Sequence, residues 1–483
     1  MIGGKPHRPK PGSKTESIVR NGTIQKIITL FKEALHGLGA GVSPTQLEAL
    51  AAMVHEAMTV QARSFHTPEH IFELSDASHP IQALAALFHD VVYYEIDQGF
   101  TPDIQRVLAP YIQETDGQLN LTEGVSRKDV LYYLTLDIFG YRPGQLLVPA
   151  QGQNEFFSAL LMNEKLNGTV SVRDLVKVTA CIEATIPFRG RNAEGESPAE
   201  VLESRLQRVS FDYALPLSRA EIEEAVRQAV AFSNRDVENF SERDTGRFLD
   251  NTWKLLPETN PSLRHTGIYT ITSYRRALQR MEAFLNQLDP ETVFNQYRDE
   301  PSPGQYQRMV ALAHRNVHTG RQYLGLKLLA IGLLEGLAMV SGGDAPVALL
   351  MGGIEDAEDA RRMEDLLPDV SSVPSVDESS TLFGLLAFGR ASSSSFDMQN
   401  SPLSLFLFKV LGWEHARQLL GQAKLMFDDQ IDAATFLERM PASVVVPVAK
   451  ASAELASTRR ATLMAYAEMR LRVAGLQPAI HRS

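Results

Sequence analysis

The stretch RSFHTPEHIFELSDASHPIQALAALFHDVVYY, residues 63–94, predicts two short helices with histidines near their ends. Proline is disfavoured inside a helix but suits the first helical position, so Pro68 and Pro80 each indicate a helix start. The polar residues just before each proline are the expected N-caps. The second helix carries apolar side chains for almost three turns and ends at His89 and Asp90. We therefore expect two helices whose ends present polar groups.

Helical periodicity also dominates the rest of the chain. Apolar residues recur at spacings of three and four in residues 24–38 and 44–58, which is typical of amphipathic helices. Ser43 is the expected N-cap of the second of these, directly before Pro44. Alternating patterns are scarce, and residues 266–274 are the best candidate for a strand. The sequence therefore predicts a mainly α fold.

Changes in composition divide the 483 residues into parts. The first residues are basic and rich in Pro and Gly, and Pro-rich polar segments near residues 256–264 indicate a boundary. Serine-rich segments flank a short apolar run late in the chain, which predicts a long loop with a buried piece. The expected parts are a disordered tail (1–22), a helical domain (23–260) and a second helical domain of unknown role (261–483) with a Ser-rich loop (370–402).

Charge and cysteine content narrow the functional classes. The formal net charge is −11, which argues against a nucleic-acid binder because neutralising phosphates needs concentrated Lys and Arg. A metal-mediated phosphate site stays compatible, since the ion supplies positive charge. The single cysteine, Cys181, excludes an intramolecular disulfide and suits a reducing cytoplasm. The apolar run 326–340 is too short to span a membrane and contains Glu335.

The histidines are candidate metal ligands. His70 lies in the first turn of its predicted helix, where the positive helix end favours the neutral imidazole that binds metals. His66 precedes it by four residues, and His89–Asp90 ends the next helix. Each feature alone is common, and a helix cap or a polar residue of the core would explain it without a metal. Their combination points to a metal site.

This combination resembles the HD superfamily of metal-dependent phosphohydrolases. It is most similar to a bacterial branch with an R-x-[FY]-H-x-x-x-H segment and an F-H-D-x-x-Y segment, and distantly similar to cyclic-nucleotide phosphodiesterases. The matching residues are Arg63, Phe65, His66, His70, Phe88, His89, Asp90 and Tyr93. A further N-E-x-x-S-A segment is matched by Asn154, Glu155, Ser158 and Ala159. The resemblance covers residues 45–245, about half of the chain.

The resemblance implies an HD-type helical bundle, followed here by the second helical domain. It implies a divalent ion (Mn, Fe, Zn or Mg) held by four ligands, which are His70, His89, Asp90 and Asp236. His66 would be the catalytic acid, and Arg63 and Glu155 would bind the substrate. The implied reaction is hydrolysis of a phosphoester, in a nucleotide or a small phosphorylated metabolite, by attack of metal-bound water.

The sequence also departs from the family pattern. Tyr93 stands where cyclic-nucleotide phosphodiesterases have a further histidine, and no histidine lies between His89 and His265. After the I-x-x-T segment, where the bacterial branch often has a histidine, the chain has Phe188 and Arg189. A second ion would therefore depend on carboxylates, of which the candidates are a bridging Asp90, Glu155 and Glu183.

These departures leave two alternative functions open. One is an HD-type oxygenase with two irons, against which the missing histidines count. The other is a non-catalytic sensor or scaffold that binds a partner, which the large unassigned region 261–483 keeps open. The sequence predicts neither the native metal nor the oligomeric state, and homo-oligomerisation stays open.

Overall fold

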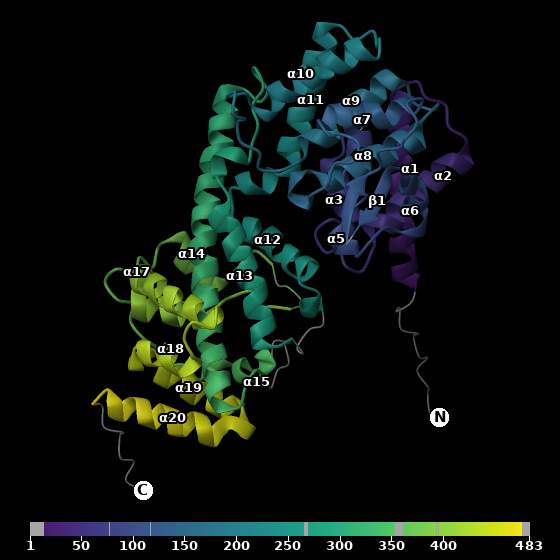
Figure 1. Ribbon diagram of the computed structural model, residues 1–483. Helices are drawn as coiled ribbons and strands as arrows, with labels where there is room; N and C mark the ends of the chain where they lie inside the picture. The colour runs from purple at the N-terminus through teal and green to yellow at the C-terminus, as the bar shows by residue number, and fades with distance from the viewer. Residues whose placement is uncertain are drawn as a thin grey trace, which may run out of the picture. The chain divides into compact units, whose positions relative to one another are not determined.

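The computed structural model confirms that the fold is mainly α (Figure 1). It describes residues 14–76, 78–115, 117–264, 269–352, 361–392, 394 and 396–475. The chain forms two compact units. Unit 1 comprises Met1–Glu238 and Thr292–Gln307, and unit 2 comprises Asn239–Glu291 and Arg308–Ser483.

Unit 1 is a helical bundle with one small hairpin. Its elements are α1 (Lys14–Gly37), α2 (Pro44–Met58), α3 (Pro68–Leu74), α4 (Pro80–Phe88), α5 (Tyr94–Asp97), α6 (Pro102–Leu108), β1 (Ile112–Thr115), β2 (Gln118–Leu121), α7 (Val130–Phe139), α8 (Gln153–Leu166), α9 (Val172–Ala184), α10 (Pro198–Asp212) and α11 (Arg219–Asp236). The predicted starts at Pro44, Pro68 and Pro80 are confirmed.

Helix α4 is the central helix of unit 1. All its residues from Ile81 to Phe88 are buried, as expected of a helix that is apolar on every side. It packs against α1, α3, α8 and α9. The ring of Phe88 lies edge-on to Phe31 of α1, with 5.7 Å between the ring centroids. This packing fixes the C-terminal end of α4, where His89 follows.

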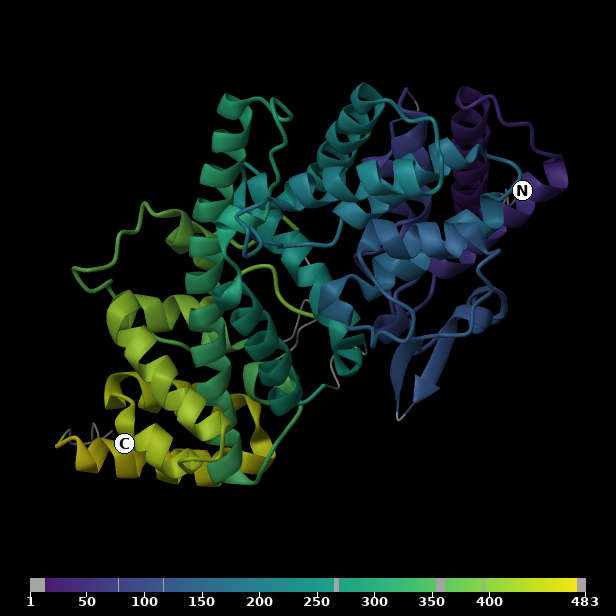
Figure 2. The ribbon, with the colours of Figure 1, turned by 45° about the horizontal axis from the view of Figure 1, so that its top comes forward.

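The hairpin is the one regular sheet among the described residues, and the sequence analysis missed it. β1 pairs antiparallel with β2, with Ile112 opposite Leu121. Figure 2 shows the hairpin at the edge of unit 1. Leu119 and Leu121 are buried on its inner face. The hairpin therefore covers part of the bundle.

Unit 2 is also helical. Its elements are α12 (Thr245–Thr259), α13 (Ile271–Gln287), α14 (Pro303–Ser341, whose first residues belong to unit 1), α15 (Val347–Met351), α16 (Thr381–Phe388), α17 (Pro402–Phe427), α18 (Ala433–Arg439), α19 (Ala442–Leu455) and α20 (Arg460–Val473). By length and composition α14 could cross a membrane, but 83% of its apolar window is buried inside the structure, as in a core helix. Glu335 of α14 pairs there with Arg275 through two contacts of 2.9 and 3.1 Å.

Several predicted boundaries differ from the structure. Helix α1 begins at Lys14, so residues 14–22 of the predicted tail are helical, and residues 1–13 lie outside the described residues. The strand predicted at 266–274 is wrong from Ile271 onward, because Thr270 caps helix α13. The change between units falls at Glu238 and not near residue 260.

The described residues of the Ser-rich region 370–402 form a loop with one helix before Pro402, α16, whose apolar side is buried. This agrees with the predicted loop and its short buried piece.

Candidate metal centre

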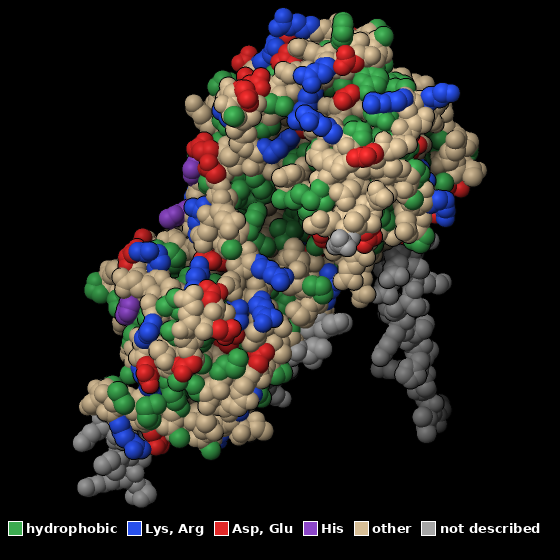
Figure 3. Space-filling view, viewed as in Figure 1, with side chains coloured by type: hydrophobic (Ala, Val, Ile, Leu, Met, Phe, Trp, Pro, Cys, Tyr) green, Lys and Arg blue, Asp and Glu red, His purple; other side chains and the backbone are tan. Residues whose placement is uncertain are grey.

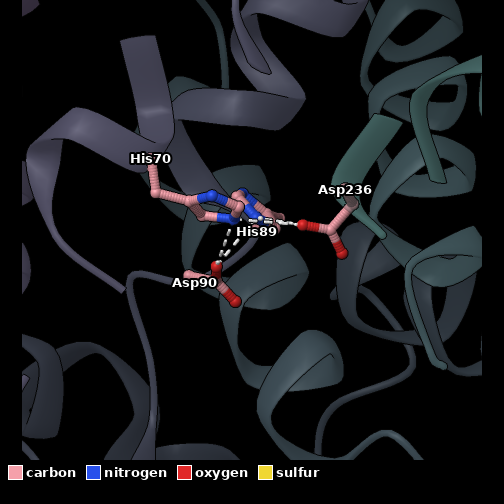
Figure 4. A group of neighbouring side chains, drawn as sticks. All are labelled: His70, His89, Asp90 and Asp236. Atoms are coloured by element: carbon pink, nitrogen blue, oxygen red, sulfur yellow. Dashed lines mark hydrogen bonds and ion pairs between the residues drawn. The ribbon is translucent and has the colours of Figure 1, made fainter. Parts of the chain in front are cut away.

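Three helix ends in unit 1 bring four predicted ligands together. His70 lies in the first turn of α3, His89 and Asp90 follow α4, and Asp236 is the last residue of α11. Figure 4 shows the two imidazoles and the two carboxylates turned toward one another. Their four donor atoms all lie within 4.8 Å of one another. Among the described residues, this is the one group of three or more His, Cys, Asp or Glu side chains with such spacing.

The donor atoms form a closed ring in which nitrogen and oxygen alternate. The ring distances are 3.1 Å (His70 Nε2 to Asp236 Oδ1), 3.5 Å (Asp236 Oδ1 to His89 Nε2), 2.8 Å (His89 Nε2 to Asp90 Oδ2) and 3.6 Å (Asp90 Oδ2 to His70 Nε2). A divalent ion with ligands at about 2.0–2.2 Å places neighbouring ligand atoms roughly 3–3.5 Å apart. The group can therefore hold a metal ion with little rearrangement.

The surroundings of His89 fix which nitrogen faces the group. Nδ1 lies 3.1 Å from the carbonyl oxygen of Ala86, to which a protonated Nδ1 donates a hydrogen bond. Nε2 is fully buried and makes no contact with hydrogen-bond geometry, although Asp90 Oδ2 is near. A buried nitrogen without a hydrogen bond is costly unless another partner satisfies it. Metal-bound histidines usually donate their other ring N–H to such an acceptor, which fixes the orientation and the tautomer of the imidazole.

Electrostatics make the group anionic at its carboxylates. Burial opposes ionisation of Asp90, but the neighbouring His89, His66 and His70 outweigh it and hold the pKa of Asp90 well below its usual range. Burial likewise opposes ionisation of Asp236, and the hydrogen bond from His70 together with the neighbouring His89 imidazole still lowers its pKa to about 2. Two negative charges in a partly buried site favour a bound cation.

Arg63, predicted to bind substrate, is engaged inside the protein. Its guanidinium donates to both carboxylate oxygens of Asp97, at 3.0 and 2.6 Å. It also donates to the carbonyl oxygens of Asp90 and Val91, at 2.6 and 3.3 Å. Through these contacts Arg63 holds the backbone at Asp90, and a contact of Arg63 with substrate stays a prediction.

His66, the predicted acid, lies beside the ligand group and outside the ring. Its imidazole is 6.0 Å from that of His70 between ring centroids and packs edge-on against Tyr93 at 4.8 Å. His66 is near enough for its charge to lower the pKa of Asp90. The Tyr93 ring thus packs against the His66 imidazole on the side of the ligand-bearing backbone.

The segment that contains Glu155 supports the backbone after Asp90. The Ser158 hydroxyl accepts a hydrogen bond from the N–H of Val92, and the Asn154 side chain accepts one from the N–H of Tyr94, both at 3.1 Å. Glu155 Oε2 is buried and has no hydrogen-bond partner. Burial raises the pKa of Glu155 to about 7, and the charges of the two ligand carboxylates add to this effect.

Glu183, a predicted alternative for a second ion, is already paired. Its Oε1 accepts from Arg189 at 2.7 Å and from Arg205 at 3.1 Å. Arg189 thus neutralises a buried carboxylate. The structure brings Glu183 into this ion pair and not into the ligand group.

Sequence reasoning missed Asp97 and the two arginines around Glu183. No spacing rule connects Asp97 to Arg63, which lies 34 residues away. The one available signal was an arginine within an otherwise buried motif, because a buried guanidinium requires carboxylate or carbonyl partners.

Neither the distribution of surface charge nor the comparison with known proteins identifies a function for this chain. On the face in Figure 3, basic and acidic side chains are interspersed, with no continuous basic stripe. The four candidate ligands come from three separate elements of unit 1, and their arrangement is known from the structure alone.

No protein-family model, curated protein or solved structure matches this chain.

Proposed function

We propose that unit 1 is a divalent-metal-dependent phosphohydrolase of the HD type. The observation that carries the proposal is the ring of two imidazoles and two carboxylates, closed by contacts of 2.8–3.6 Å. Mixed nitrogen and oxygen ligands suit Zn, Mn or Fe, and Mg less well. A single ion is proposed, since Glu183 is committed to arginines.

Each residue has a defined task in the proposed reaction. A bound ion would lower the pKa of water to make a nucleophile and would polarise a phosphoryl oxygen. His66, beside the group, donates a proton to the leaving oxygen. Arg63 and Asp97 keep the Asp90 backbone in place through the contacts described above. Glu155 lies near the two carboxylates and faces the substrate side in this proposal.

The first test is the metal content of the purified protein after incubation with Mn, Fe or Zn. We expect about one equivalent in the wild type and a loss of it in Asp90→Ala. The matched control is Asp76→Ala, because Asp76 forms an exposed pair with His79 at 3.0 Å, away from the ligand group. Equal metal content in wild type and Asp90→Ala would refute the assignment of the ligands.

The second test separates chemistry from metal binding. We expect the metal-loaded wild type to hydrolyse a member of a phosphoester panel. His66→Gln should keep the metal and reduce kcat by about 10²–10⁴-fold, the usual contribution of a general acid. His79→Gln is the control and should leave kcat unchanged. Full metal content without hydrolysis of any phosphoester would favour the sensor or scaffold alternative.

A further inference from the structure

The N-terminus of α17 in unit 2 is buried and has no cap. Ser401, Leu403 and Ser404 are each about 3% exposed or less. The Ser401 hydroxyl does not cap the helix, since it contacts the Tyr323 hydroxyl at 2.9 Å and the Lys327 ammonium at 3.3 Å. Pro402 has no N–H. Within the described part of the chain, the N–H groups of Leu403 and Ser404 have no hydrogen-bond acceptor. A buried helix end without acceptors is costly unless a ligand or water supplies them.

A second unpartnered donor, the hydroxyl of Tyr274, lies at the start of α17. Tyr274, from α13, is 2% exposed, and among the described residues its hydroxyl has no hydrogen-bond partner. Tyr274, Lys327 and the first residues of α17 line one cavity. Burial first, and then the charge of Asp397, raises the pKa of Tyr274 well above 10, so its hydroxyl keeps a proton to donate. Two unpartnered backbone donors and one unpartnered hydroxyl thus belong to one cavity.

Charge at the cavity also favours an anion. The Lys327 ammonium is 2.7 Å from Asp397 Oδ2, and Arg390 Nη1 is 3.2 Å from the same oxygen. Trp253 Nε1 donates to that oxygen as well, at 2.8 Å. The single carboxylate of the cavity wall is therefore neutralised from inside the protein. The positive end of α17 remains to attract an anion, because Asp397 already balances the charge of the Lys327 ammonium.

We propose that this cavity of unit 2 binds the carboxylate group of a small organic acid. The cavity volume is about 20 Å³. Because one water needs roughly 10–15 Å³ of such space, the cavity accommodates one or two water-sized groups, which favours the two oxygens of a planar carboxylate over the four of a tetrahedral phosphate. The two carboxylate oxygens would accept from the N–H groups of Leu403 and Ser404 and from the Tyr274 hydroxyl. This site is separate from the ligand group of unit 1 and does not depend on its function.

The test uses acetate as the probe on the full chain, with sodium phosphate as the comparison at equal ionic strength. We expect acetate to bind saturably by calorimetry and phosphate to show no such binding. Tyr274→Phe removes only the hydroxyl and should weaken acetate binding about tenfold or more, as expected for a hydrogen bond to a charged group. Tyr466→Phe is the matched control, because the Tyr466 hydroxyl in α20 is also buried and unpartnered but lies outside this cavity.

A second measurement covers the case in which Tyr274→Phe fails to fold. In the wild type, acetate should slow hydrogen exchange at the amides of Leu403 and Ser404. Absence of saturable acetate binding, or unchanged exchange at these amides, would overturn the proposal and leave water as the occupant. Equal weakening in both tyrosine variants would place acetate elsewhere and would also overturn it.

Discussion

At the scale of single residues, Arg63 contributes both to the stability of the fold and to the position of Asp90 in the ligand group. Its side chain is fully buried, and it holds Asp97 with two charge-assisted hydrogen bonds and the Asp90 carbonyl with a third. Removing one partner of a buried ion pair leaves an uncompensated charge. We expect Arg63→Met to lower the free energy of unfolding by about 3–5 kcal/mol in urea titrations.

The same variant tests the positioning role of Arg63. Loss of a partner that orients a ligand typically costs about 10–100-fold in metal affinity, so metal binding should weaken even where Arg63→Met is folded. The control is Arg63→Met combined with Asp97→Leu, which removes both charges and should recover part of the stability but not the metal affinity. Wild-type stability in Arg63→Met would contradict the contacts described here.

Glu155 should make the free energy of unfolding depend on pH, with a sign that follows from its raised pKa. Its folded pKa is raised to about 7, so between its unfolded value near 4.5 and pH 7 the folded state binds more protons than the unfolded state. Stability of the metal-free protein should therefore fall as pH rises through this window, by about 1–3 kcal/mol. Glu155→Gln should lack this part of the slope in urea unfolding at pH 4.5–7. Parallel pH profiles for both proteins would be inconsistent with a raised pKa.

The residue set of the ligand group could be predicted, but its geometry could not. His70, His89 and Asp90 stand in short local motifs, whereas Asp236 lies 166 residues from the histidine it contacts. Only the packing of α3, α4 and α11 brings these helix ends together. The contacts of Arg63 could not be predicted for the same reason, since its partner Asp97 carries no signal in the sequence.

At the scale of elements, α11 illustrates what local sequence determines. Ser218 and Glu221 form a reciprocal capping box at its start, and Asp236 is its last residue. Ser218→Ala removes a side-chain acceptor for a backbone N–H and should lower the free energy of unfolding by about 0.5–2 kcal/mol. Metal content should stay unchanged, because the substitution lies 18 residues from the ligand. Ser218→Asp, which keeps an acceptor, should retain most of the stability; equal losses in Ser218→Ala and Ser218→Asp would argue against the cap.

Helix starts were predictable because their determinants are local. Ser43 with Gln46, and the prolines at the first positions of α3 and α4, act within one turn. The hairpin at 112–121 was not predictable, since its short strands are stabilised by burial of Leu119 and Leu121 against the bundle. Residues 271–274 read as a strand by alternation, but the cap at Thr270 and the long amphipathic pattern that follows make them helical.

At the scale of the whole molecule, the two units are not contiguous in sequence. Residues 292–307 return to unit 1 after α12 and α13 have contributed to unit 2. Within unit 1, the Asn234 side-chain amide donates to the carbonyl oxygen of Asn295 and accepts from the N–H of Asn295, both at 2.8 Å. Domain boundaries predicted from composition place each segment in the same domain as its neighbours in the sequence. Such boundaries cannot predict that residues 292–307 belong to unit 1 again.

Because the chain forms two units, we predict that a bound metal stabilises unit 1 and that bound acetate stabilises unit 2. A ligand that binds only the folded state stabilises it by about 2.7 kcal/mol at a concentration 100 times its Kd. In hydrogen exchange by mass spectrometry, Mn or Zn should slow exchange in peptides covering α3, the end of α4 and the end of α11, while acetate should slow it at the start of α17. Asp90→Ala should abolish the first effect and leave the second. If metal protected the start of α17 as strongly as α3, the two sites would be coupled, and the assignment of separate functions to the two units would be wrong.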